Sequence, residues 1–296
     1  MSQSIGTMKY VLVTAARNEQ AYIEGTIRSV LEQSVRPLKW VIVSDGSTDG
    51  TDTIIRRYAE SSEFIHLVRK EMSRGQEGFA SKVAAIHLGY EQLKGLEYDF
   101  IGNLDADLSF KADYFQQLLE RFEDNPGLGI GGGYIHEAFG GRFRPRPSNA
   151  EHSVAGGIQL FRRECYQTIG GLQPLALGGE DTCAEIMARM AGWEVQAFPG
   201  LEVFHHKRSV AARGALRDNF RQGLLDHSFG TLVLFEFGKC IKRVAEPPYF
   251  MGALLRLAGY LWGYTSRKKR VLSKAQVGFL RVEQARSILK ALKYSL

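Results

Sequence analysis

Three short stretches of the chain place acidic side chains beside glycine, serine, threonine or alanine. They read SDGSTDGT at residues 44–51, LDAD at 104–107 and GGED at 178–181. Carboxylate oxygens are ligands that Mg²⁺ and Mn²⁺ accept readily, and a positioned carboxylate is also a general base. One stretch alone is a weak signal, because Asp49 also suits a helix cap. Likewise, Glu180 and Asp181 also suit the first turn of a helix.

The elements expected around these stretches alternate between strand and helix. Short apolar runs predict strands at residues 9–14, 40–44, 64–68 and 99–104. Apolar residues at helical spacing predict helices at 19–33, 49–59 and 78–93. This alternation is typical of a parallel sheet with helices on both faces, in which ligands bind at the carboxyl ends of the strands. The first two acidic stretches lie at such strand ends.

Four segments together resemble the family 2 glycosyltransferases of the GT-A fold, over about residues 8–210. They are VLVTAARNE at 11–19, VIVSDGSTDGT at 41–51, NLDADLSF at 103–110 and GGED at 178–181. The resemblance implies a Rossmann-like α/β fold with a mixed, mostly parallel sheet and helices on both faces. The nucleotide-sugar half would span about 8–110 and the acceptor half about 111–210. A basic, mainly helical extension would follow at 211–296.

The resemblance also implies an activity and roles for individual residues. The activity is inverting transfer of a sugar from a nucleotide diphosphate sugar, with UDP favoured, to an acceptor hydroxyl, with Mn²⁺ or Mg²⁺ as cofactor. Asp181 is the expected catalytic base, with Glu180 beside it on the acceptor side, and Asp107 the expected metal ligand. The residues expected to bind the nucleotide sugar are Ala15, Arg17, Glu19, Asp45 and Asp105.

Other positions have two readings. His205 and His206 follow a strand-like run at 201–204, and either imidazole suits Mn²⁺. Arg74 and Lys82 lie between the third and fourth strands, where either can pair with a diphosphate or remain a solvated surface charge. Gly156 and Gly157 are expected to border the acceptor site, because glycine permits close approach to the backbone. The basic segment 142–146 beside them is a lid, a site that binds an acceptor carrying phosphate, or an exposed solubilising loop.

Charge and hydrophobicity divide the chain unevenly. Residues 1–200 carry 20 basic and 26 acidic side chains, whereas residues 201–296 carry 18 basic and 6 acidic. The segment 249–264 is apolar apart from Arg256, is followed by the basic cluster RKKR at 267–270, and is shorter than the roughly 20 residues that span a bilayer. We expect peripheral membrane contact through 247–270. A helix packed on the catalytic domain is the alternative.

Cysteine usage and the first residues favour a cytoplasmic protein, at the inner face of the cell membrane. The three cysteines form no disulfide framework, and residues 1–7 lack the pattern of a signal peptide. The acceptor is expected to be a saccharide or lipid-linked saccharide, and no stacking aromatic pattern points to nucleic acid. The rival hypotheses are a sugar nucleotidyltransferase and a non-catalytic module that binds nucleotide sugar or membrane. The former needs a glycine-rich basic loop, which TAARNE at 14–19 does not supply.

Overall fold

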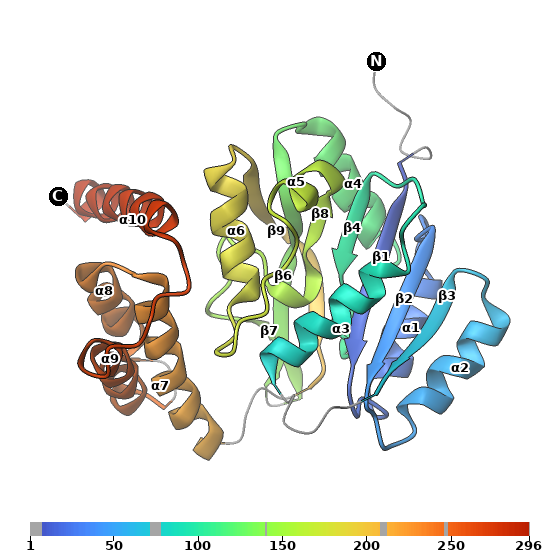
Figure 1. The fold of residues 1–296 in the computed structure, drawn as a ribbon, viewed down its shortest axis with the longest axis horizontal. Coiled ribbons are helices and arrows are strands. Elements are labelled where there is room, and N and C mark those ends of the chain that lie inside the picture. Colours follow the sequence, from blue (N-terminus) through green and yellow to red (C-terminus); the bar gives the residue numbers. More distant parts are fainter. Residues whose placement is uncertain (1–7, 72–77, 140, 208–211, 246–247, 296) are drawn as a thin grey trace. The chain divides into compact units, whose positions relative to one another are not determined.

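The fold was analysed in a computed structural model, which describes residues 8–71, 78–139, 141–207, 212–245 and 248–295. The chain divides into two compact units. The first comprises Met1–Ala176 with Glu180–Arg208, and the second comprises Leu177–Gly179 with Ser209–Leu296. Figure 1 shows the order of the elements along the chain.

Strands and helices alternate through the first part of the first unit, and the order becomes less regular after β4. The strands are β1 (Tyr10–Ala16), β2 (Lys39–Asp45), β3 (Ile65–Lys70), β4 (Phe100–Asn103), β5 (Leu108–Phe110), β6 (Leu128–Phe139), β7 (Arg142–Pro145), β8 (Leu160–Arg162) and β9 (Glu194–His205). The helices are α1 (Ile23–Leu31), α2 (Thr51–Ser61), α3 (Phe79–Glu91), α4 (Tyr114–Asp124), α5 (Arg163–Thr168) and α6 (Glu180–Met190).

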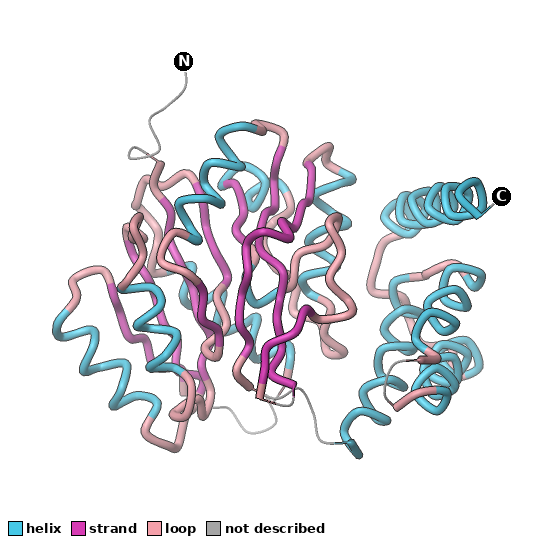
Figure 2. Tube along the Cα trace, turned by 180° about the vertical axis from the view of Figure 1, so that it is seen from behind, coloured by secondary structure: helices cyan, strands magenta, loops and turns pink. Residues whose placement is uncertain are grey.

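All the strands belong to one mixed sheet in the order β3-β2-β1-β4-β8-β6-β9-β5, with β7 paired to β6 (Figure 2). The pairs among β3, β2, β1 and β4 are parallel. β8 runs antiparallel to both β4 and β6, and β6 is parallel to β9. The parallel half therefore brings the carboxyl ends of β1, β2 and β4 to one edge, where loops can build a ligand site.

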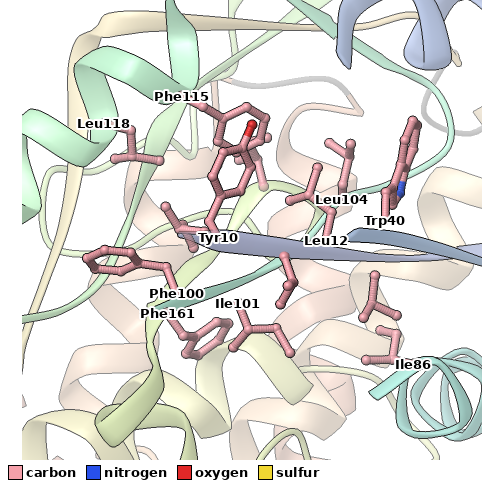
Figure 3. Close-up of a cluster of buried hydrophobic side chains, with 14 of the residues drawn as sticks. Tyr10, Leu12, Trp40, Ile86, Phe100, Ile101, Leu104, Phe115, Leu118 and Phe161 are labelled. Atoms are coloured by element: carbon pink, nitrogen blue, oxygen red, sulfur yellow. The ribbon is translucent and has the colours of Figure 1, made fainter. Parts of the chain in front are cut away.

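Apolar side chains cover both faces of this sheet. Figure 3 shows Tyr10 and Phe115 on one face, and Ile101 and Phe161 on the other. The rings of Tyr10 and Phe115 stack with centroids 4.7 Å apart, which anchors α4 against β1. The buried indole N–H of Trp40 donates to Thr14 Oγ1 at 2.9 Å, so the polar atom of this large core residue is satisfied.

Three segments differ locally from the elements that the sequence predicts. The apolar run at 157–161 predicts a strand, but residues 156–158 form a 3-10 turn and the strand, β8, begins only at Leu160. The strand expected to run to residue 104 ends at Asn103, so residues 104–107 form the connection between β4 and β5. The basic segment 142–146 is not a simple loop, because Arg142–Pro145 pairs with β6 as a hairpin.

The second unit is helical and contains α7 (Ala212–Phe229), α8 (Val233–Arg243), α9 (Phe250–Thr265) and α10 (Lys274–Ser295). Glycines let α7 and α9 approach backbone to backbone. A Cβ added at Gly223 would overlap the Arg256 carbonyl, and one at Gly259 would overlap the Phe220 carbonyl. In the described part of the chain, no helix is both long enough and apolar enough to cross a bilayer.

Candidate active site

A pocket of about 260 Å³ lies at the carboxyl edge of the parallel strands. The residues that line this pocket end or follow β1, β2 and β4, or lie at the start of α3. The lining residues are Ala15, Ala16, Arg17, Glu19, Asp45, Gly78, Lys82, Asp105, Ala106 and Asp107. All the residues predicted to bind the nucleotide sugar are present except Arg74, which lies outside the described residues.

Asp45 ends β2 and is buried with both carboxylate oxygens occupied. Lys70 Nζ donates to one oxygen at 2.6 Å, and Ser81 Oγ donates to the other at 2.7 Å. Lys70 also donates to Ser81 at 3.0 Å, which closes the triangle. Because Lys70 ends β3 and Ser81 lies in the first turn of α3, this network ties both elements to the carboxylate and fixes its orientation.

Asp105 forms an ion pair with Lys82 of α3, with Nζ and Oδ1 2.7 Å apart. Burial alone would raise the pKa of Asp105, but the Lys82 ammonium outweighs it and holds that pKa below its usual value. The charges of Asp105, Glu180 and Asp181 all act to raise the pKa of Lys82. Lys82 is therefore the cation around which these three carboxylates gather.

The paired histidines separate into two environments. Nε2 of His205 lies 3.1 Å from Oδ2 of Asp107, whereas Nε2 of His206 lies 2.7 Å from the Ser109 hydroxyl. The register of β9 against β5, which pairs His205 with Leu108, creates this difference. Burial lowers the pKa of His205, but the nearby carboxylates of Asp107 and Glu137 outweigh it and raise the pKa to about 9.

Asp107 and His205 have features that fit a shared divalent cation. Asp107 is buried, and among the described residues its Oδ1 has no hydrogen-bond partner. A buried carboxylate oxygen without a partner is costly unless an ion or a donor occupies it. The described residues contain no group of three His, Cys, Asp or Glu arranged to hold a metal by themselves. An ion here would therefore take its remaining ligands from substrate oxygens or water, as Mg²⁺ commonly does.

Asp181 and Asp105 lie on either side of a two-glycine turn. A Cβ at Gly156 would lie 2.9 Å from the Asp181 carboxylate, and a Cβ at Gly157 would collide with that of Asp105. Glu180 begins α6 and is buried, and burial raises its pKa. Both glycines predicted to border the acceptor therefore contact carboxylates, and side chains at these positions would push the carboxylates apart.

Sequence analysis missed a third acidic residue on α6, Glu185. Its carboxylate is 3% exposed and accepts hydrogen bonds from Val154 N–H at 2.6 Å and Ser153 Oγ at 3.2 Å. Burial raises the pKa of Glu185 to about 8. It thus holds the segment that leads into Gly156. In the sequence, a glutamate in the middle of a helix otherwise looks like part of a solvated face.

Two other partners were not predicted. Lys207 Nζ lies 2.5 Å from Oε1 of Glu19, so the segment after β9 reaches the loop after β1. Glu137 lies 3.8 Å from Nδ1 of His205 and 2.7 Å from Arg146 of the basic segment 142–146. The pairing of β6 with β7 and β9 brings Glu137, Arg146 and His205 together, so no local sequence signal could have identified these contacts.

Glu185→Gln should change how stability depends on pH. The folded chain keeps a proton on Glu185 up to about pH 8, while an ordinary glutamate releases it near 4.5. The contribution of this carboxyl to stability is therefore largest at low pH and is lost as pH rises towards 8. The unfolding free energy of wild type relative to the variant should fall by up to about 1.4 kcal/mol per pH unit.

Urea unfolding followed by circular dichroism at several values between pH 5 and 8 measures this difference. Glu151→Gln, at an exposed position in the preceding turn, is the matched control and should leave the pH profile parallel to wild type. A parallel profile for Glu185→Gln as well would contradict the assignment of a buried, protonated carboxyl.

Comparison with known proteins places the chain in a family. Residues 11–178 match the model for "Glycosyl transferase family 2". The putative teichuronic acid biosynthesis glycosyltransferase TuaG of Bacillus subtilis is 34% identical over 109 residues, which are 37% of this chain and 40% of that protein. The poly-beta-1,6-N-acetyl-D-glucosamine synthase of Staphylococcus aureus is 32% identical over 147 residues, 50% of this chain and 31% of that protein. The chain thus matches less than half the length of either relative.

Solved structures share the fold at low identity. A mannosyltransferase from Pyrobaculum calidifontis, in complex with GDP-Man and Mn²⁺, aligns with a TM-score of 0.56 and 18% identity, covering 96% of this chain and 82% of that one. Residues 1–349 of S. aureus TarS, in complex with UDP-GlcNAc, align with a TM-score of 0.55 and 13% identity, covering 92% and 78%. These likenesses confirm the predicted α/β GT-A fold with a helical C-terminal region. With the family match over more than half of its length, the chain belongs to glycosyltransferase family 2.

Proposed function

We propose that this protein transfers a sugar from a nucleotide diphosphate sugar to an acceptor hydroxyl, with inversion at the anomeric carbon and with one divalent cation. The observation that carries the proposal is the convergence of separate carboxylates at one edge of the sheet. Asp105 and Asp107 line the same pocket, and the 156–157 turn joins Asp105 to Asp181. Family membership supports the class of reaction.

The pocket side of the site would bind the donor. Asp45, held in place by Lys70 and Ser81, would accept from the base, and Ala15, Arg17 and Glu19 would line the loop against it. Asp105 would face the ribose, and Lys82 would pair with the diphosphate. Asp107 and His205 would hold Mn²⁺ or Mg²⁺, which neutralises charge on the leaving diphosphate as a Lewis acid. His206 is the weaker candidate, because its ring bonds to Ser109 instead.

Asp181 would act on the acceptor. Its carboxylate takes the proton of the acceptor hydroxyl while that oxygen forms a bond to the anomeric carbon. The bond from the anomeric carbon to the diphosphate oxygen breaks on the opposite side, and the nucleoside diphosphate leaves with the bonding electrons. Attack opposite the leaving group inverts the configuration. Gly156, Gly157 and Glu180 border this side, where the missing glycine side chains leave room for a sugar.

The relatives narrow the class of product. By their names, TuaG is a putative glycosyltransferase of teichuronic acid biosynthesis, and the S. aureus relative is a synthase of poly-beta-1,6-N-acetyl-D-glucosamine. The TarS complex contains UDP-GlcNAc, and the mannosyltransferase complex contains GDP-Man. We therefore assign this chain to cell-surface polysaccharide or glycolipid assembly, with UDP as the favoured nucleotide. A saccharide or lipid-linked saccharide would be the acceptor, met at the inner face of the cell membrane through a peripheral contact of residues 247–270.

A donor screen tests the donor and metal assignments. Purified protein is incubated with UDP-, GDP- and dTDP-sugars and Mn²⁺, and slow donor hydrolysis is followed. One nucleotide should dominate and EDTA should abolish turnover. Asp107→Asn should lower metal-dependent turnover at least about a hundredfold, because the ion loses a charged ligand. Asp124→Asn, at an exposed position on the same unit, should match wild type. Turnover that persists in EDTA would refute the role of Asp107.

Replacement of the proposed base separates binding from transfer. Asp181→Asn should retain donor affinity, measured by calorimetry with the preferred nucleotide sugar, and should lower kcat for transfer on the order of 10²–10⁴-fold. The asparagine keeps the shape of the side chain and its hydrogen bond from Thr182 N–H. Transfer near the wild-type rate would place the base elsewhere, and a parallel loss of donor affinity would make Asp181 a binding residue.

A further inference from the structure

Helix α9 carries apolar side chains on the side that does not pack. Met251, Leu254, Ala258, Leu261 and Trp262 are exposed, and their spacing of three, four or seven residues places them along one stripe of the helix. The packed side consists of small or polar residues, namely Gly252, Ala253, Arg256, Gly259, Tyr260 and Gly263. A helix of a water-soluble bundle normally has the opposite arrangement.

Helix α8, which packs against α9, repeats this inversion. Leu234, Phe237, Ile241 and Val244 are exposed at spacings of three and four residues, so they also form a stripe. The buried residues of α8 are Glu236 and Cys240. The predicted contact segment, 247–270, does not include α8, because the prediction rests on the apolar run at 249–264 and the basic cluster that follows it.

Charged groups occupy the interior that these helices share with α7. Arg256 forms ion pairs with Asp226 and with Glu236, the latter with Nε and Oε1 2.9 Å apart. Lys239 Nζ lies 2.7 Å from Asp226 Oδ1. Burial raises the pKa of Glu236 to about 7. Paired charges inside and apolar residues outside are the arrangement expected of helices that face a medium less polar than water.

The flanking charge indicates which apolar medium fits. The exposed basic cluster 267–270 directly follows α9, and residues 201–296 carry 18 basic against 6 acidic side chains. Anionic lipid headgroups attract such clusters, while a second copy of the same basic unit would be repelled. Helices of 11 and 16 residues are too short to span the roughly 30 Å hydrocarbon core, so they suit its interface.

We propose that the outward stripes of α8 and α9 form one lipid-docking surface, which inserts into the headgroup region of an anionic bilayer. The proposal rests on the membrane contact included in the proposed function, and goes beyond it by adding α8 and by assigning the binding to inverted helix faces rather than to basic charge alone.

Flotation of the full-length protein with vesicles tests the proposal. Vesicles of phosphatidylcholine alone are compared with vesicles that contain about one third phosphatidylglycerol. Wild type should float with the anionic vesicles. The double variant Phe237→Ser, Ile241→Ser should lower the partition coefficient about tenfold or more, because two apolar groups no longer enter the interface. These side chains are 50% and 58% exposed, so their loss leaves the packed side of α8 intact.

A matched control has equally exposed apolar residues in the other unit. Leu38→Ser with Met190→Ser removes two side chains that are each 45% exposed, and should float like wild type. Trp262 supplies a second measurement, because its exposed indole on α9 should be quenched by brominated lipid. Trp262→Phe should remove the quenched component and thereby assign it to α9.

The results of these experiments distinguish a failure of the lipid-docking inference from a failure of the proposed function. Equal flotation of wild type and the α8 double variant would overturn the inference, and would leave a contact through α9 and the basic cluster. The inference would also be overturned if neither wild type nor any variant floats, while sedimentation velocity shows wild type as a dimer and the α8 double variant as a monomer. That result would assign the stripes to contact with a second copy. Donor hydrolysis in solution does not require vesicles, so its failure would count only against the proposed catalysis.

Discussion

The pocket depends on charge compensation at the carboxyl edge of the sheet, where the fold concentrates several carboxylates. Three of them have a cationic partner drawn from another segment of the chain. The pairs are Glu19 with Lys207, Asp45 with Lys70, and Asp105 with Lys82. The opposite charges of these lysines offset the repulsion among carboxylates that the fold brings together. The same ion pairs tie β3, α3 and the segment after β9 to this edge.

The ion pairs do not by themselves set the distances between the carboxylates. Backbone contacts set these distances. The amide of Asp105 donates to the carbonyl of Gly157 at 2.8 Å, and Glu185 holds Val154 N–H from the opposite direction. The turn is thus held between α6 and the segment that follows β4, and it has no side chain of its own at residues 156 and 157. Under the proposed function, this gap is the space in which the acceptor meets the donor. The charged pocket and the two-glycine turn would therefore belong to the same active site.

Sequence alone predicted the parallel half of the fold well. Each strand there is a short apolar run, and β1, β2 and β3 are each followed by a segment with apolar residues at helical spacing. Prediction from the sequence failed where a strand pairs with a segment distant in the sequence, or where an element is too short to show a periodic pattern. The hairpin of β7, the connection at 104–107 and the turn at 156–158 depend on tertiary contacts. The choice between His205 and His206 needed the register of β9 against β5, which places His205 beside Asp107. Glu185 was not predicted, because only its burial distinguishes it from a surface glutamate. The sequence does not show which glutamates are buried.

The C-terminal helices illustrate the same limit. Hydrophobicity along the sequence identified the α9 segment, yet it could not say whether those apolar residues turn inwards or outwards. In the structure the small residues and Arg256 face inwards, because only glycine permits the close crossing of α7 and α9 and because Arg256 meets two buried carboxylates. Because these groups fill the interior of the bundle, the large apolar residues of α9 lie on its outer side. The exposure of the stripe therefore follows from the packing of the bundle, and a lipid surface is the environment in which that packing costs least.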